Sequence, residues 1–91
     1  MSNVDTVEEN VQQFEELDTC GLFCPLPIVK TSERMKTMQV GETLLVISDD
    51  AGILEDMPAW CRANGHLLLN QQQTSGIYRM RIQKKGREDA L

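Results

Sequence analysis

The sequence predicts a two-layer α/β sandwich in which two helices pack on one face of a four-stranded mixed sheet. Its length of 91 residues suits one domain with a single modest core. Segments with strand and helix patterns follow one another in the order βαβαββ. The last two strand segments are joined by TSG, a sequence typical of a compact hairpin. Two helices covering one sheet face is the layered arrangement that this order can reach.

The first strand and the first helix are predicted on either side of a short loop. Residues 13–18, QFEELD, are compatible with a short edge strand, and the loop TCGLF follows with Gly21 as its flexible point. From Pro25 onward, apolar or small residues recur at steps of three and four. This spacing predicts an amphipathic helix whose apolar face comprises Ile28, Ser32, Met35 and Met38.

The middle of the chain predicts a buried strand and a second helix. Residues 42–49, ETLLVISD, form a continuous apolar run with many β-formers, which indicates a buried strand. The helix that follows would be capped by Asp49 or Asp50 and closed by Gly65. Pro58 lies inside it, and one kinked helix is favoured over a helix that begins near Pro58. Its apolar face comprises Ile53, Met57, Trp60, Cys61 and Asn64.

Residues 66–73 and 77–83 predict the hairpin, and the domain is expected to span residues 13–84. In the second hairpin strand, Tyr78, Met80 and Ile82 alternate with Ile77, Arg79, Arg81 and Gln83. Residues 1–12 are interpreted as a flexible leader and residues 85–91 as a disordered tail. His66 is interpreted as a surface residue at a strand end, and Met35, Met38, Met57 and Cys61 as core residues.

Composition narrows the class of partner and the compartment. The formal net charge is −5, which disfavours direct nucleic-acid binding because that affinity comes from clustered Lys and Arg. A basic surface on a partner protein is a better match. No stretch is apolar for long enough to span a bilayer, and the N-terminus lacks the regions of a signal peptide. We therefore expect a cytoplasmic protein without membrane contact.

The segment CPLP predicts a reactive thiol at the start of the first helix. Pro25 fits the first helical position and Pro27 the third, since neither position needs a backbone N–H donor within the helix. Cys24 would then be the N-cap residue, with its sulfur facing the backbone N–H groups of Leu26 and Ile28. Such a position typically lowers a thiol pKa from about 8.5 by a unit or more, which favours a sulfur nucleophile.

The sequence shows no further catalytic residues and no motif for a metal or a phosphate group. The single histidine, His66, is far from Cys24 in sequence, so no Cys/His or Ser/His/Asp set is indicated. The three cysteines do not have zinc-ligand spacing, and no Gly-rich phosphate loop is present. We therefore expect neither a metal nor a cofactor. A lone thiol without a base suits a protein that carries a group on sulfur while its partners supply the remaining chemistry.

The segment from Leu17 to Asp50 resembles the TusA-like (SirA/YedF-type) sulfur carrier family, and the resemblance continues to about Lys84. The matching features are LD, Gly21, the CPxP box at residues 24–27, GE at residues 41–42, the strand ending in DD, and DMPAWCRANGH. The resemblance implies a βαβαββ two-layer sandwich. It also implies that Cys24 accepts sulfane sulfur as a persulfide and transfers it to another protein.

The resemblance further implies the kinds of partner and pathway. Donors in this family are cysteine desulfurases or rhodanese-type enzymes, and acceptors include DsrE-like sulfurtransferases. The sulfur serves 2-thiouridine formation in tRNA, cofactor thiolation or dissimilatory sulfur oxidation. A carrier needs an accessible thiol, so we expect a monomer.

Some alternatives stay open at the level of sequence. Cys20 departs from the aliphatic residue of the tRNA-thiolation members: it is either a small residue packed under the loop or a second thiol able to pair with Cys24. The chain could therefore be a Cys20/Cys24 dithiol redox switch, or a regulatory binding module in which the proline box only shapes a surface. A basic strip for an acidic partner is as well supported as a solvated edge; it would comprise Arg79, Arg81, Lys84 and Lys85.

Overall fold

A computed structural model describes residues 14–85 and shows the predicted order of elements. The predicted leader, residues 1–12, and most of the predicted tail lie outside the described residues. The elements are β1 (Phe14–Asp18), α2 (Leu26–Lys36), β2 (Thr43–Ser48), α3 (Ile53–Asn64), β3 (Leu67–Thr74) and β4 (Ile77–Gln83). Neither helix has the length and apolarity that crossing a membrane would require.

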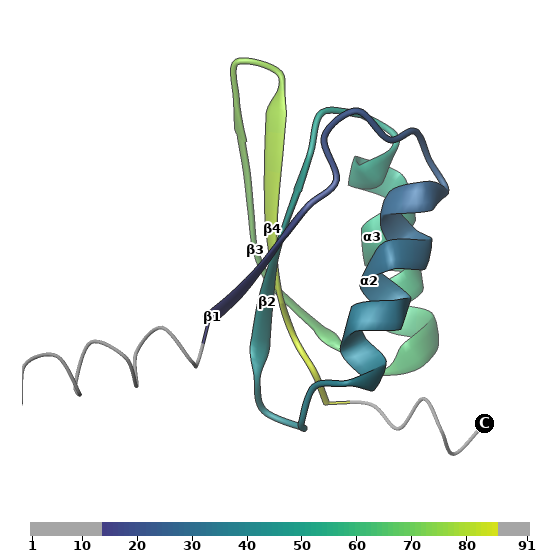
Figure 1. Ribbon diagram of the computed structural model, residues 1–91, viewed down its shortest axis with the longest axis vertical. Coiled ribbons are helices and arrows are strands. Elements are labelled where there is room, and N and C mark those ends of the chain that lie inside the picture. The colour runs from purple at the N-terminus through teal and green to yellow at the C-terminus, as the bar shows by residue number, and fades with distance from the viewer. Residues whose placement is uncertain (1–13, 86–91) are drawn as a thin grey trace, which may run out of the picture.

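The four strands form a mixed sheet in the order β1-β2-β4-β3. β1 runs parallel to β2, whereas β4 runs antiparallel to both of its neighbours. Both helices lie on the same side of the sheet (Figure 1). The predicted two-layer sandwich with an edge strand at β1 is therefore confirmed.

The predicted buried strand is found at β2, and it is fully buried on one face only. Its burial alternates, with Leu44, Val46 and Ser48 buried and Leu45 and Ile47 half-buried. The reason is that both helices cover one face, so the other face of this central strand has no second layer above it. A continuous apolar run on a half-covered strand leaves aliphatic side chains on the uncovered face.

The core lies between the sheet and the two helices and is rich in methionine and aliphatic side chains. The predicted core positions Met35, Met38, Met57 and Cys61 are confirmed, since each is at most 4% exposed. The predicted division of β4 is also confirmed, because Tyr78, Met80 and Ile82 face the core. The buried hydrophobic cluster comprises Met35, Met38, Leu44, Val46, Ile53, Met57, Cys61, Tyr78, Met80 and Ile82.

Helix α3 ends as the sequence predicts but begins differently. Gly65 ends it in a left-handed conformation (φ 76°), and one helix continues through Pro58, as expected. The N-cap residue is Gly52, so neither Asp49 nor Asp50 occupies the predicted cap position. Asp50 lies two residues before this N-cap, and its Oδ1 accepts the N–H of Gly52 at 3.0 Å.

The hairpin is tighter than predicted, and His66 is buried. Thr74 belongs to β3, so Ser75 and Gly76 alone make the turn, both with positive φ. His66 is only 5% exposed, which contradicts its interpretation as a surface residue. Its ring lies 5.1 Å from the Trp60 ring, and its Nδ1 accepts the N–H of Lys85 at 3.2 Å.

Lys84 fastens the end of the sheet to the end of α2. Its Nζ donates to the carbonyl oxygens of Met35 (2.6 Å) and Met38 (2.7 Å). A cation at this position satisfies terminal carbonyl groups and interacts favourably with the helix dipole. Lys84 therefore does not belong to a basic docking strip.

Replacing Lys84 by Met is expected to lower the free energy of unfolding by about 1–2 kcal/mol, because two carbonyl groups lose a charged donor. Lys85→Met is the matched control, since the Lys85 side chain is exposed and only its backbone N–H bonds to His66. Urea unfolding followed by circular dichroism measures both variants. Equal destabilisation by the two changes would contradict the role assigned to Lys84.

Candidate functional site

Two loops that follow the carboxyl ends of neighbouring strands form the candidate site. β1 and β2 are parallel neighbours, so the loops that follow them, residues 19–25 and 49–52, leave from the same edge. Both loops lie at the same end of the structure as the start of α2 (Figure 1). The edge beyond the carboxyl ends of parallel strands is a common place for functional residues.

Three sets of hydrogen bonds fasten the first loop to the end of β2 and to the segment that follows it. The buried Thr19 donates through its N–H (2.7 Å) and its Oγ1 (2.6 Å) to the carbonyl oxygen of Ile47. The N–H of Gly21, a residue with φ of 90°, bonds to Asp49 Oδ1 at 3.1 Å. The N–H of Cys24 bonds to Asp50 Oδ2 at 2.7 Å. The two aspartates therefore position the cysteine loop, a role that their interpretation as helix caps missed.

The start of α2 differs from the prediction in one consequential detail. The N-cap residue is Pro25, so Cys24 lies one residue before the cap, and Pro27 is buried in the first turn. The N–H of Leu26 bonds to the Phe23 carbonyl oxygen at 2.8 Å, and the N–H of Ile28 to that of Pro25 at 3.0 Å. The amides expected to face the Cys24 sulfur are thus already paired. The Cys24–Pro25 peptide bond is cis.

The Cys24 sulfur instead faces the first turn of α3. A Cβ atom built on Gly52 would lie only 3.1 Å from Cys24 Sγ, so the missing side chain of this glycine makes room for the thiol. Two carboxylates accompany it: Asp50 holds the backbone of Cys24, and Asp56 hydrogen-bonds with the thiol from one turn further along the helix. Cys24 is half-buried in this setting.

These surroundings raise the pKa of the Cys24 thiol to about 11, in contrast to the lowering that the sequence predicts. The largest cause is removal of the sulfur from water, followed by the hydrogen bond to Asp56 and the negative charges of Asp50 and Asp56. Hydrogen bonds from the N–H groups of Gly52 and Cys24 lower the pKa of Asp50 and keep its charge beside the sulfur. Cys24 is therefore a protonated, hydrogen-bonded thiol at neutral pH.

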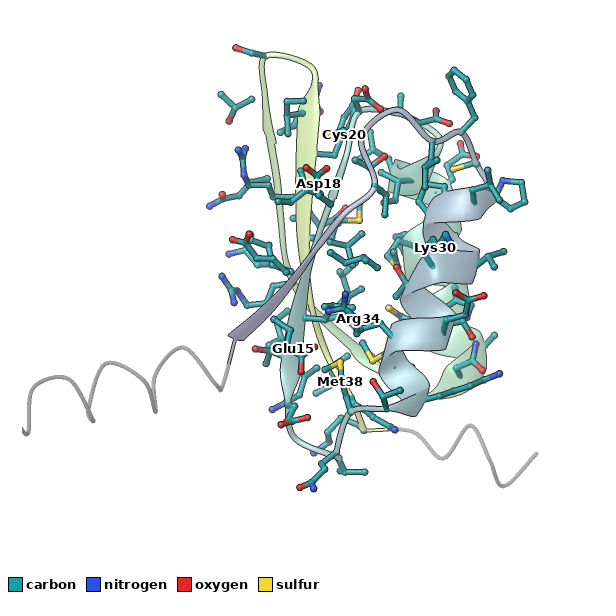
Figure 2. The ribbon with its side chains drawn as sticks, in the orientation of Figure 1. Glu15, Asp18, Cys20, Lys30, Arg34 and Met38 are labelled. Carbon is teal, nitrogen blue, oxygen red and sulfur yellow. The ribbon has the colours of Figure 1, made fainter. Side chains whose placement is uncertain are left out.

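The other two cysteines lie in different surroundings. Cys20 is exposed, so its interpretation as a residue packed under the loop is wrong. Its N–H bonds to Asp18 Oδ1 at 2.9 Å, and desolvation followed by the Asp18 hydrogen bond raises its pKa. Figure 2 shows Cys20 above Asp18, where the chain leaves β1. Cys61 is buried in the core, and burial raises its pKa to about 11.

Exposed apolar side chains stand directly before Cys24 and on the first turns of the two helices, and we call this group the apolar rim. Phe23 is 73% exposed directly before Cys24, and three further members come from the first turns of α2 and α3. The sequence analysis did not predict this group, although an aromatic residue directly before a loop cysteine could have indicated an exposed apolar surface there. Its members are Phe23, Leu26, Val29 and Leu54.

No cluster of three His, Cys, Asp or Glu side chains within residues 14–85 is arranged to hold a metal ion. What the site offers chemically is one thiol, two carboxylates and exposed apolar side chains on the neighbouring turns. Such a set can hold a group on sulfur and dock against another protein.

Comparison with known proteins matches this region to one family. The model of the family described as Sulfurtransferase TusA matches residues 15–84. A provisionally named sulfur carrier protein of Neisseria meningitidis serogroup A is 39% identical over 71 residues, which cover 78% of this chain and 96% of that protein. A relative in Bacillus subtilis with the same provisional description, YrkI, is 41% identical over 68 residues, covering 75% and 91%.

Another such relative, in Aquifex aeolicus, is 44% identical over 68 residues that cover 75% of this chain. The match covers 34% of the length of the Aquifex protein, so the chain spans about a third of that relative.

Proposed function

Since the chain belongs to the Sulfurtransferase TusA family, we propose that it is a sulfur carrier that holds sulfane sulfur as a persulfide on Cys24 and delivers it to a partner sulfurtransferase. The observation that supports this proposal most directly is how the structure holds Cys24 in place. Its backbone is held by Asp50, and its sulfur occupies the space that the missing side chain of Gly52 leaves.

The proposed loading step is an exchange without net oxidation. The Cys24 sulfur attacks the outer sulfur of a persulfide on the donor enzyme. The donor's sulfur–sulfur bond breaks while a new one forms on Cys24, and the donor's cysteine leaves as a thiolate. That thiolate takes up the proton that Cys24 loses. Delivery repeats the same exchange toward the acceptor, with Cys24 as the leaving sulfur.

In this proposal the Cys24 thiol of the free carrier is unreactive, and docking of a partner makes it reactive. A thiol protonated beside Asp50 and Asp56 reacts slowly, which protects Cys24 from adventitious oxidation. A cationic side chain from a docked partner would offset the two carboxylates and favour the thiolate. The apolar rim provides the uncharged part of the same docking surface.

The proposed partners follow the family. A cysteine desulfurase or a rhodanese-type enzyme would be the donor, and a DsrE-like sulfurtransferase the acceptor, in the cytoplasm. The pathway would be tRNA 2-thiouridine formation, cofactor thiolation or sulfur oxidation. The net charge of −5 supports contact with basic protein surfaces rather than with nucleic acid directly.

The test is to incubate the full chain with a cysteine desulfurase and cysteine and to weigh it by intact mass spectrometry. Wild type and Cys20→Ser are expected to gain one sulfur atom, whereas Cys24→Ser gains none. The Cys20→Ser arm is the matched control, because Cys20 is exposed and has its own carboxylate neighbour. Loading that persists in Cys24→Ser, or that depends on Cys20, would refute the proposal, and the second result would favour the dithiol switch.

A further inference from the structure

The sheet face that the helices leave uncovered, called the open face here, carries an ordered charge pattern. Strand pairing aligns its side chains in rows, since paired residues of neighbouring strands point to the same side. One row runs Asp18, Ile47, Arg79 and Gln72. The next runs Glu16, Leu45, Arg81 and Asn70. Each row therefore reads acid, aliphatic, arginine, amide from β1 to β3.

The middle of the open face is apolar and slightly hollowed. Leu45 and Ile47 on β2 are half-buried although no helix covers them. A shallow hollow lies beside them, lined by Leu45, Asn70, Gln72, Arg79 and Arg81. Guanidinium and carboxamide N–H groups around a hollow form a good setting for a carboxylate. Carboxylates of this kind stand on the same face, on the exposed side chains of Glu16 and Asp18.

We propose that the open face is a self-complementary docking surface for a second copy of this chain. Neighbouring strands are about 4.8 Å apart, so the acidic and arginine columns lie at roughly equal distances on either side of β2. A two-fold axis parallel to β2 exchanges these two columns. It brings Glu16 of each copy over Arg81 of the other, and Asp18 over Arg79.

The same axis stacks the aliphatic side chains of β2 on themselves. Leu45 meets Leu45 and Ile47 meets Ile47 of the other copy, as an isologous interface requires. The acidic column then enters the hollow between the arginines and the amides of β3. Two sheets stacked in this way form an aligned β-sandwich with a helical layer outside each sheet.

The extent of the face indicates a weak dimer. Only short segments of three strands would meet. We therefore expect each copy to bury less surface area than the roughly 800 Å² per partner that is typical of a stable interface. We therefore expect dissociation constants of about 10–500 μM and strong weakening by salt, because exposed charge pairs are screened.

The proposed dimer leaves the sulfur site accessible. Cys24 directly precedes the N-cap of α2, and its sulfur faces the start of α3. Both helices lie on the side of the sheet away from the open face (Figure 1). The monomer expected from the sequence rested on the need for an accessible thiol, and the dimer meets that need equally. The inference does not depend on the proposed sulfur-carrier function.

Analytical ultracentrifugation of the full chain in a reducing agent tests the dimer, since the reductant removes any disulfide through Cys20. The weight-average mass should rise with concentration up to about 1 mM and fall again in 0.5 M salt. The charge reversals Glu16→Lys and Arg81→Glu should each weaken dimerisation at least tenfold, because like charges then face one another. Glu33→Lys, an exposed change on α2, is the matched control and should leave it unchanged.

Mixing the two variants provides the decisive measurement. In a heterodimer of the Glu16→Lys chain with the Arg81→Glu chain, both contacts again join opposite charges. The mixture should therefore dimerise within about threefold of wild type, although each variant alone does not. Circular dichroism verifies that all the chains are folded. A wild type that stays monomeric, a mixture that stays monomeric, or equal weakening by Glu33→Lys would overturn the proposal.

Discussion

Cys24 is expected to react with a small disulfide reagent about 12-fold more slowly at pH 7.4 than a thiol of ordinary pKa. A rise in pKa from 9.0 to about 11 lowers the thiolate fraction roughly 100-fold at this pH. The more basic thiolate is intrinsically more nucleophilic, which recovers about 8-fold. The rate should keep rising about tenfold per pH unit through pH 10, whereas an ordinary thiol levels off near pH 9.

The measurement uses a Cys20→Ser background, so that the half-buried Cys24 and the buried Cys61 are the thiols that remain. Asp56→Asn removes the hydrogen-bonding carboxylate and should accelerate the reaction several-fold at pH 7.4. Glu55→Gln removes the same charge from the neighbouring, exposed position of α3 and should change the rate little. A wild-type rate that levels off below pH 9 would contradict the raised pKa.

The same shift predicts a loss of stability in alkali. The folded chain holds the Cys24 proton more tightly than the unfolded chain does, so its pKa is higher in the folded state. The stability linked to this proton is fully present below the unfolded pKa of about 8.5 and disappears as the pH rises toward 11. Urea unfolding between pH 8 and pH 10.5 should show this decline, and Cys24→Ser should reduce it.

Met57→Ala is expected to lower the free energy of unfolding by about 2–5 kcal/mol, the largest effect among the stability changes considered. Met57 is completely buried on α3 and belongs to the cluster that joins this helix to the sheet. Truncation removes buried methylene and thioether groups and leaves a cavity that the neighbours fill only partly. Domains of this size are stable by roughly 5–10 kcal/mol, so the variant should be close to unfolding at 37 °C.

Leu54→Ala is the matched control on the same helix, because Leu54 is 38% exposed and belongs to the apolar rim. Leu54→Ala should lower the free energy of unfolding by less than about 1 kcal/mol. Urea midpoints measured by circular dichroism compare the two variants. Similar midpoint shifts would show that α3 does not depend on its buried face in the way described.

The type and order of all six elements could be predicted, because the two helices and β4 have a clear hydrophobic period and turn residues separate the other strands. The Tyr78, Met80 and Ile82 face of β4 is an example, since alternation alone assigned it to the core. The half-exposure of β2 could not be predicted in the same way. It depends on which sheet face receives the helices, and an apolar run is compatible with either outcome.

The position of Cys24 in the chain was predictable, but its electrostatic surroundings were not. A rule for helix starts placed the sulfur over unpaired amides, whereas the turn at residues 23–26 uses the Leu26 N–H within the loop. The groups that act on the sulfur, Gly52 and Asp56, come from a helix about thirty residues away in the chain. Only the parallel pairing of β1 with β2 brings these segments together.

Burial of His66 escaped prediction for a similar reason. A histidine at the start of a strand is usually exposed, but the ring of Trp60 from the preceding helix covers this one. Lys84 is another case, because its partners are carbonyl groups at the end of α2, on the opposite layer. Both contacts arise from the packing of the helices on the sheet.

The strand order has a consequence for synthesis on the ribosome. β4, the last described strand, is inserted between β2 and β3, so the sheet has no continuous middle until this strand has left the exit tunnel. Until then, the nascent polypeptide exposes unpaired edges of both β2 and β3. Assembly of the sheet is therefore expected to be concerted and to wait for β4, and the loop that carries Cys24 acquires its final shape only with that step.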